Sequence, residues 1–226
     1  MALLNIIPDS YPILRKTSKR IRHVDEDFRK LVDDMYESMV ENFGIGLAAI
    51  QVGVPRRMFI YEIPIRRIKG YESCEPGDGE IVERSENEET VVEAITESAA
   101  ADEEEFDPGY TGEYTVCINP RIIEREGAII DEEGCLSRAG WVAKVERSYK
   151  VTFEACDIEM KKFTRTVTGL EARCVQHEID HLDGILFTDR CIEGSLRELT
   201  AEEIEGESEP ADEEVQAEDA VGAADG

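Results

Sequence analysis

Two histidines and a glutamate late in the chain have the spacing of a metal-binding motif. The segment Gln176-His-Glu-Ile-Asp-His181 contains His-Glu-x-x-His. On a helix, positions i and i+4 project from the same face, so the imidazoles of His177 and His181 can reach one metal ion. Glu178 can then approach a water molecule on that ion without being a ligand. The alternative is a solvated helix face, but the chain has only 3 histidines and two of them have this spacing.

A third protein ligand is needed, because a catalytic metal centre usually has three protein ligands and one open position. No histidine follows His181, and the carboxylates beyond it lie mostly in an acidic, polar tail. The third ligand is therefore expected upstream, and the candidate is the thiolate of Cys135 in Glu133-Gly-Cys-Leu-Ser137. A single cysteine is more often a small buried residue, so this assignment depends on the neighbouring sequence.

Two segments have the apolar spacing of amphipathic helices. From Asp25 to Phe43 the apolar residues follow the i, i+3, i+4 pattern, with Asp25 as the expected N-cap and Gly44 at the expected C-terminal position. The second helix is predicted from Leu170 to Leu182, ended by Gly184, and it carries the histidine motif.

The remaining segments are mostly of strand type. Strands are expected from Met58 to Ile65, from Tyr114 through Ile130, from Trp141 to Val167, and briefly over Ile185–Phe187. Glu193 to Glu205 is predicted to form a further short helix. Because one early and one late helix flank the strands, the sequence predicts an α+β fold rather than alternating βαβ units.

The negative charge is concentrated in two segments. The chain of 226 residues has a net charge of −27. Residues 71–113 hold 16 acidic residues and one arginine, and residues 200–226 hold 11 acidic residues and no lysine or arginine. This composition is typical of disorder. We therefore expect one catalytic domain over 1–199, an acidic disordered insert at 71–113 and an acidic disordered tail at 200–226.

Composition also bears on location and partners. No apolar run approaches the roughly 18 residues of a membrane span, and no signal peptide is evident, so a cytoplasmic protein with no membrane partner is expected. The acidic segments would repel phosphate, so no direct nucleic-acid partner is expected. The 6 cysteines are expected to be free thiols or a metal ligand rather than three disulfides.

Three segments together resemble a known family. Gly44-Ile-Gly-Leu-Ala-Ala-Ile-Gln51, Glu133-Gly-Cys-Leu-Ser137 and Gln176-His-Glu-Ile-Asp-His181 resemble, in this order, the signature motifs of peptide deformylases. The similarity covers roughly residues 5–70 and 114–190. It implies mixed or antiparallel sheets packed around a central C-terminal helix, and a metal-dependent hydrolase that releases formate from the N-terminal formylmethionine of nascent polypeptides.

The resemblance also implies roles for individual residues. The metal would be Fe²⁺, although Zn²⁺, Co²⁺ or Ni²⁺ suit the same ligands. Glu178 would take a proton from water and pass it to the departing amine, while the Gln51 side chain and the Leu136 N–H would stabilise the oxyanion. Glu133 and Arg147 resemble a structural ion pair. The implied metal ligands are Cys135, His177 and His181.

A set of residues around these motifs is expected to bind the substrate. The backbone near Gly44, Ile45, Gly46 and Gly134 would pair with an extended peptide. Leu170 and Cys174, on the helix turns before His177, would line a pocket for the methionine side chain, with core packing as the alternative reading.

The sequence departs from the family at several places, and other functions stay open. Arg138-Ala-Gly140 replaces an apolar residue followed by Pro-Gly, and the acidic tail puts ribosome docking through a basic C-terminal helix in doubt. One alternative is a metalloendopeptidase, which the missing downstream ligand disfavours. Another is a catalytically silent deformylase-like binding protein, which the presence of all five chemical positions disfavours.

Overall fold

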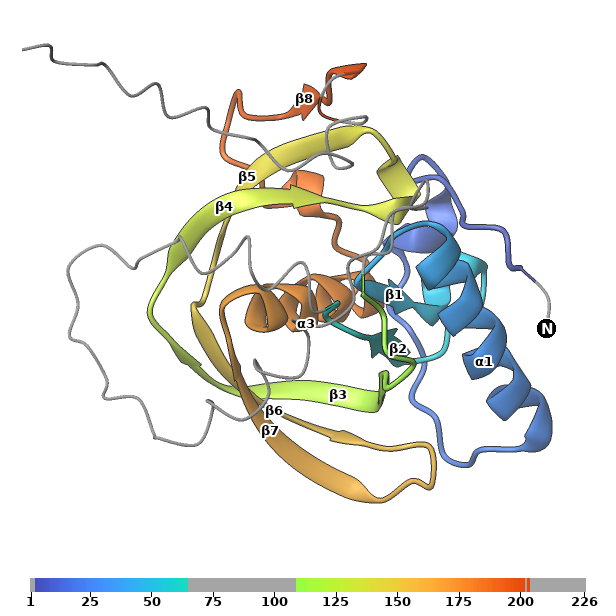
Figure 1. The fold of residues 1–226 in the computed structure, drawn as a ribbon. Coiled ribbons are helices and arrows are strands. Elements are labelled where there is room, and N and C mark those ends of the chain that lie inside the picture. Colours follow the sequence, from blue (N-terminus) through green and yellow to red (C-terminus); the bar gives the residue numbers. More distant parts are fainter. Residues whose placement is uncertain (1–2, 65–108, 202, 204–226) are drawn as a thin grey trace, which may run out of the picture.

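The computed structural model describes residues 3–64, 109–201 and 203. Most of the predicted insert and tail therefore lies outside the described residues. Within the described part, two α-helices and two antiparallel sheets are arranged as an α+β fold (Figure 1), which confirms the predicted fold class. No helix in this part is long and apolar enough to cross a membrane.

Both sheets curve around the late helix α3, which occupies the middle of the molecule (Figure 1). All pairings between their strands are antiparallel. The five-stranded sheet has the order β1-β2-β3-β6-β7, formed by Gly46–Ala48, Met58–Tyr61, Thr115–Glu126, Lys150–Cys156 and Lys162–Thr168. The three-stranded sheet has the order β4-β5-β8, formed by Ile129–Gly134, Trp141–Arg147 and Arg197–Glu198.

Helix α3, Gly169–Leu182, is buried along nearly its whole length. Every residue from Ala172 to Leu182 is buried, because sheets surround the helix rather than covering one face. The chain leaves the helix at Gly184, as predicted, with a φ of +76°. A Cβ atom there would lie 2.6 Å from the carbonyl oxygen of Arg15, so both the conformation and the space require glycine.

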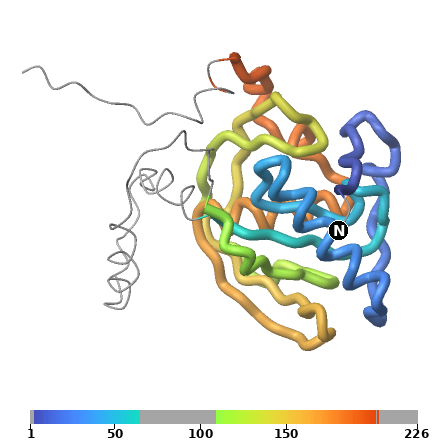
Figure 2. Tube along the Cα trace, turned by 45° about the vertical axis from the view of Figure 1, so that its right-hand side comes forward, coloured from blue at the N-terminus to red at the C-terminus, as the bar shows by residue number. Residues whose placement is uncertain are grey.

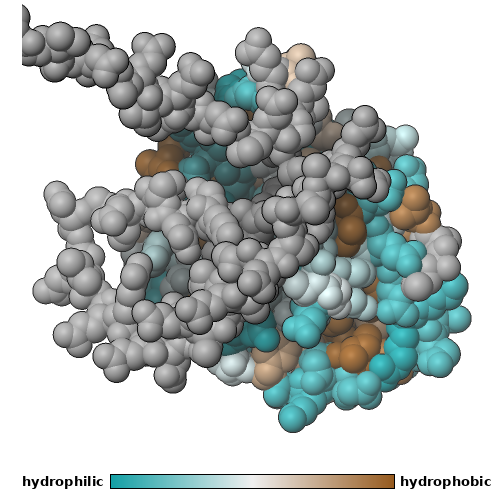
Figure 3. Space-filling view, viewed as in Figure 1, coloured by the Kyte–Doolittle hydropathy of each residue, from teal (hydrophilic) through white to brown (hydrophobic). Residues whose placement is uncertain are grey.

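Helix α1, Glu26–Glu41, lies against the sheet edge formed by β1 and β2 (Figures 1 and 2). The predicted cap is confirmed, because Asp25 accepts a hydrogen bond from the Phe28 N–H at 2.9 Å. The helix ends slightly earlier than expected, and Phe43 rather than Gly44 takes the left-handed conformation, with a φ of 54°. On the face shown in Figure 3 the outer surface of this helix is mostly hydrophilic.

Some predicted elements were wrong in extent or type. The strand from Met58 ends at Tyr61, residues 62–64 are not in a strand, and Ile65 lies outside the described residues. Ile185–Phe187 does not form a strand. The Leu186 N–H donates a hydrogen bond to the side chain of Asp189 instead, and Leu186 precedes a 3-10 turn at Phe187–Asp189.

The segment Glu193–Glu205 was predicted to be helical, and over most of its length this was wrong. Its residues 197–198 form strand β8, which pairs with Trp141 and Val142 of β5. The preceding Gly194 has a φ of +77°, which helical residues do not adopt. The prediction missed this pairing because the partner strand lies more than 50 residues upstream.

The predicted insert at 71–113 also needs a change at its C-terminal boundary. Residues 109–113 fall within the described part of the chain and contact the folded domain. The rest of that prediction, and the tail from residue 204, lie outside the described residues.

Candidate active site

The two histidines of the motif are neighbours on α3, as their spacing predicts. The ring centroids of His177 and His181 lie 4.8 Å apart, and the ring planes are inclined by 78°. His181 is 1% exposed and His177 is 9% exposed. The third histidine, His23, is exposed and lines a separate pocket beside Lys19 and Arg56. Two nearly buried imidazoles one turn apart can therefore act together on one ligand.

Cys135 brings a sulfur to the same place from a different element. It follows the end of β4 and precedes the short 3-10 turn Leu136–Arg138. Its Sγ lies 3.2 Å from the Nε2 of His181. The ligand atoms of Cys135, His177 and His181 all lie within 4.8 Å of one another. Metal–ligand bonds of about 2.0–2.3 Å in a tetrahedral site place donor atoms roughly 3.3–3.6 Å apart. The 3.2 Å between Cys135 Sγ and His181 Nε2 is close to this range, and one sulfur with two imidazoles is a donor set that suits a divalent transition metal.

The orientation of His177 is set from behind by Glu133. The Nδ1 of His177 lies 3.0 Å from a carboxylate oxygen of Glu133, which leaves the other ring nitrogen for the metal site. Arg147 and Arg173 both donate hydrogen bonds to the same carboxylate. Burial raises the pKa of Glu133, but the hydrogen bonds from Arg147 and His177 outweigh it and hold the pKa well below its usual value. The predicted Glu133–Arg147 ion pair is confirmed.

Glu178 lies on the pocket side of α3 and is 4% exposed. Burial raises its pKa to about 7, although the nearby charge of His177 opposes that shift. Among the described residues its Oε2 atom has no hydrogen-bond partner. A Cβ at Gly46 would lie 2.6 Å from the other carboxylate oxygen, so β1 approaches Glu178 closely only because residue 46 is glycine.

Gln51 places an amide group beside Cys135. Its Oε1 accepts a hydrogen bond from the Ala48 N–H at 2.8 Å, which orients the amide. Its Nε2 donates to Ser137 Oγ at 3.2 Å and to Cys135 Sγ at 3.5 Å. The side chain is thus held in a short 3-10 turn at Ala49–Val52 with its N–H groups directed toward Cys135 and Ser137. Leu136 lines the same pocket.

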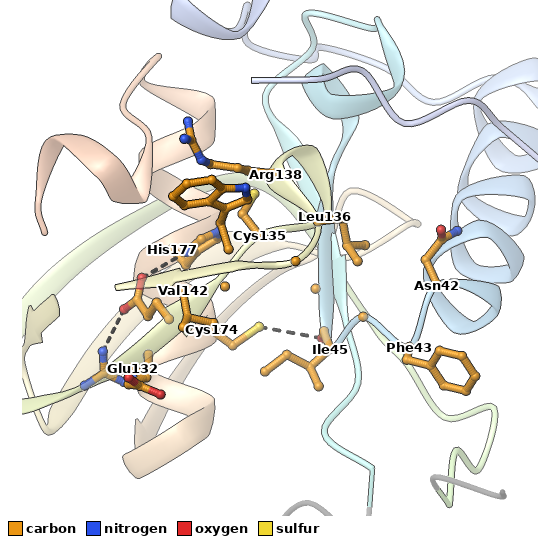
Figure 4. Close-up of a pocket in the computed structure, with 18 of the residues that line it drawn as sticks. Asn42, Phe43, Ile45, Glu132, Cys135, Leu136, Arg138, Val142, Cys174 and His177 are labelled. Atoms are coloured by element: carbon orange, nitrogen blue, oxygen red, sulfur yellow. Dashed lines mark hydrogen bonds and ion pairs between the residues drawn. The ribbon is translucent and has the colours of Figure 1, made fainter. Parts of the chain in front are cut away.

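A pocket of about 980 Å³ opens beside these groups. All the predicted site residues line it except His181. Figure 4 shows Cys135, Leu136 and Cys174 among the residues that line it, with Ile45 beside Cys174. The predicted substrate-binding residues that line this pocket are Gly44, Ile45, Gly46, Gly134, Leu170 and Cys174.

Several pocket residues were missed by the sequence analysis. Arg173 lies four residues before His177, on the same side of α3, and only 3% of it is exposed. A charged residue at this spacing from a buried motif was the signal that could have revealed it. Trp141 and Leu199 also line the pocket, and the Leu199 N–H bonds to the Gly140 carbonyl. Their positions depend on the pairing of β5 with β8, which no local pattern indicated.

Known proteins are similar in sequence to this chain over most of its length. A family model for polypeptide deformylase matches residues 3–196. The chain is 37% identical over 189 residues to a peptide deformylase of Alkalilimnicola ehrlichii, covering 84% of this chain and 82% of that protein. It is 36% identical over 211 residues to a peptide deformylase of Thermomicrobium roseum, covering 93% of this chain and 98% of that protein.

Solved structures agree with this result. The fold matches a peptide deformylase of Legionella pneumophila with a TM-score of 0.61 and 30% identity, covering 85% of this chain and 88% of that one. It matches a Met-Ala-Ser-bound deformylase of Acinetobacter baumannii with a TM-score of 0.62 and 25% identity, covering 84% of this chain and 98% of that one.

The fold and the Cys-His-His group define a metal-dependent hydrolase. The chain belongs to the peptide deformylase family, whose members remove the formyl group from N-terminal formylmethionine.

Proposed function

We propose that Cys135, His177 and His181 hold a ferrous ion with which this chain deformylates nascent polypeptides. The closeness of the three ligand atoms, within 4.8 Å of one another, carries this proposal. One thiolate and two imidazoles also suit Zn²⁺, Co²⁺ or Ni²⁺, so the preference for Fe²⁺ rests on the family resemblance. When bound, the ion supplies a Lewis acid that polarises a carbonyl group and lowers the pKa of water.

Glu178 is the proposed general base and general acid. It would take a proton from the attacking water and later deliver one to the departing amine. Burial raises the pKa of this carboxyl group, and a raised pKa suits a group that both accepts and delivers a proton. Support also comes from its Oε2 atom, which is buried and has no hydrogen-bond partner among the described residues.

Gln51 and the backbone N–H of Leu136 are the proposed oxyanion donors. Such donors act best when they are oriented before the reaction starts. The hydrogen bond from Ala48 to the Gln51 Oε1 provides that orientation and leaves the amide N–H groups on the side of Cys135. Leu136 follows Cys135 directly in the turn, so its N–H belongs to the peptide bond that joins the two residues.

The substrate is proposed to bind in extended form across the pocket. The backbone of Gly44, Ile45 and Gly46 would contact it on one side, and Gly134 on the other. Leu170 and Cys174 would line the space for the methionine side chain, whose burial stabilises binding by roughly 1.5–3 kcal/mol. The A. baumannii relative was solved with Met-Ala-Ser bound, which supports a peptide of this kind as the ligand.

The setting of the reaction is part of the same proposal. The catalytic domain would comprise residues 1–199, interrupted by the acidic insert and followed by the acidic tail. The enzyme would act in the cytoplasm on chains that emerge from the ribosome. Residues 200–226 contain no lysine or arginine, so this segment would not supply a basic helix for docking on the ribosome.

The test is turnover of formyl-Met-Ala-Ser by protein purified without oxygen. We expect formate release by the wild type and none by Glu178→Ala, which should still bind one divalent ion per chain. Turnover by Glu178→Ala would refute the role given to that carboxylate. Cleavage of an unformylated peptide at an internal bond would favour an endopeptidase, and a wild type that binds metal but releases no formate would favour a silent relative.

A further inference from the structure

Residues 109–114 lead into strand β3 and contact the wall of the active-site pocket. The Tyr110 hydroxyl donates a hydrogen bond of 2.7 Å to the backbone carbonyl of Gly44. Gly44 belongs to the loop between α1 and β1, and it lines the pocket together with Ile45 and Gly46. A residue that lies outside all three sequence motifs therefore contacts the backbone of the first motif.

A second contact anchors the same segment. The Thr111 Oγ1 donates to a carboxylate oxygen of Glu62 at 2.9 Å, and the Tyr36 hydroxyl donates to the other oxygen at 2.7 Å. Glu62 is only 6% exposed, so this carboxylate is held firmly between α1 and the segment. Its backbone N–H in turn donates to the carbonyl of Ile45 at 3.0 Å.

These contacts fix two successive peptide planes. In a trans peptide the C=O of one residue and the N–H of the next are coplanar and point in opposite directions. By holding the Gly44 carbonyl, Tyr110 therefore also sets the direction of the Ile45 N–H. The next plane is held through the Ile45 carbonyl by Glu62 and by Cys174 Sγ at 3.6 Å, the contact drawn in Figure 4.

These contacts leave the Ile45 N–H available to donate a hydrogen bond to a ligand in the pocket. No hydrogen bond between described residues uses it, although backbone donors in folded proteins are nearly always paired. We propose that Tyr110 is a positioning residue for substrate binding, because it holds the Ile45 N–H in the direction that an extended peptide in the pocket requires. This inference rests on the proposed function and adds a residue to it that acts through Gly44.

Tyr110→Phe tests the inference, because it keeps the ring and removes only the hydroxyl. Losing this restraint should raise the KM for formyl-Met-Ala-Ser about 3- to 10-fold, with kcat within about 2-fold of the wild type. A merely structural role would lower the active fraction and hence kcat, and would leave KM unchanged. The matched control is Tyr114→Phe, which removes a hydroxyl that donates to Asp33 at 3.1 Å on the exposed surface.

A second measurement does not depend on turnover. Calorimetric titration of the metal-free protein with the tripeptide Met-Ala-Ser should show a Kd that is weaker by the same factor in Tyr110→Phe and unchanged in Tyr114→Phe. An unchanged KM and Kd in a folded Tyr110→Phe protein, or a loss confined to kcat, would overturn the inference. A wild type that binds the tripeptide but does not deformylate would instead overturn the proposed function.

Discussion

Arg147 donates two parallel hydrogen bonds to Glu133, from Nε at 2.7 Å and from Nη2 at 2.9 Å. Both side chains are 4% exposed. The third nitrogen of Arg147 donates to Asp180 on α3, and Glu133 also faces His177. This ion pair therefore joins the three-stranded sheet to the helix that carries two metal ligands.

Arg147→Met should destabilise the protein, because the buried carboxylates of Glu133 and Asp180 each lose one of their two arginine partners. We expect a loss of about 3–5 kcal/mol in the free energy of unfolding. Arg121→Met is the matched control, since its pair with Glu154 is exposed by 68% and 47% and should be worth less than about 1 kcal/mol. Urea denaturation of the metal-free proteins measures both, and equal losses would contradict the assigned role.

Glu133→Gln should weaken metal binding by about 10- to 100-fold, because groups that orient a ligating histidine usually contribute this much. The substitution keeps the size of the side chain but removes its charge behind His177. Competition with a chelator for Co²⁺ or Zn²⁺ measures the affinity. Glu132→Gln, one residue earlier and paired with Arg197 at 3.0 Å, should leave the affinity unchanged. If both variants bind alike, Glu133 does not act through the histidine.

Gly46→Ala should impair both stability and turnover. The added carbon would lie 2.6 Å from Glu178 Oε1 and 2.8 Å from Cys174 Sγ, and both groups are buried. We expect a cost of about 1–3 kcal/mol in unfolding and a fall in kcat of about 10²-fold as Glu178 is displaced. Gly134→Ala is the control for stability, because its added carbon meets nothing closer than 3.5 Å. Thermal and urea unfolding of the pair would show whether the close approach matters.

Cys117 should make the protein less stable at alkaline pH. Burial raises the pKa of this thiol far above its usual value, so the native state keeps the proton while the unfolded chain loses it above a pKa of about 8.5. The stability that the buried thiol contributes is therefore present below that pH and lost as the pH rises. The free energy of unfolding should fall by about 1 kcal/mol between pH 8.5 and 9.5. Cys117→Ala should reduce this slope relative to the wild type. Identical slopes in unfolding experiments would contradict the prediction.

Local features were predictable from the sequence because short-range geometry determines them. The helical repeat of 3.6 residues places His177 and His181 on one face whatever surrounds them. The side chain of Asp25 caps a helix through an N–H only three residues away. Gly184 ends α3 because the left-handed conformation there is cheap only for glycine. Sequence alone thus determined helices α1 and α3 and the two histidines of the Cys-His-His group.

Tertiary structure decided which distant groups meet. Cys135 lies 46 residues before His181, and Tyr110 lies 66 residues after Gly44, so no periodic pattern connects them. The family resemblance supplied the first of these pairs and could not supply the second. Strand β8 was misread as helix because a two-residue strand depends on the partner strand that accepts it rather than on its own propensity. Such contacts form because the two sheets pack around α3 and bring distant segments together, so only the folded chain reveals them.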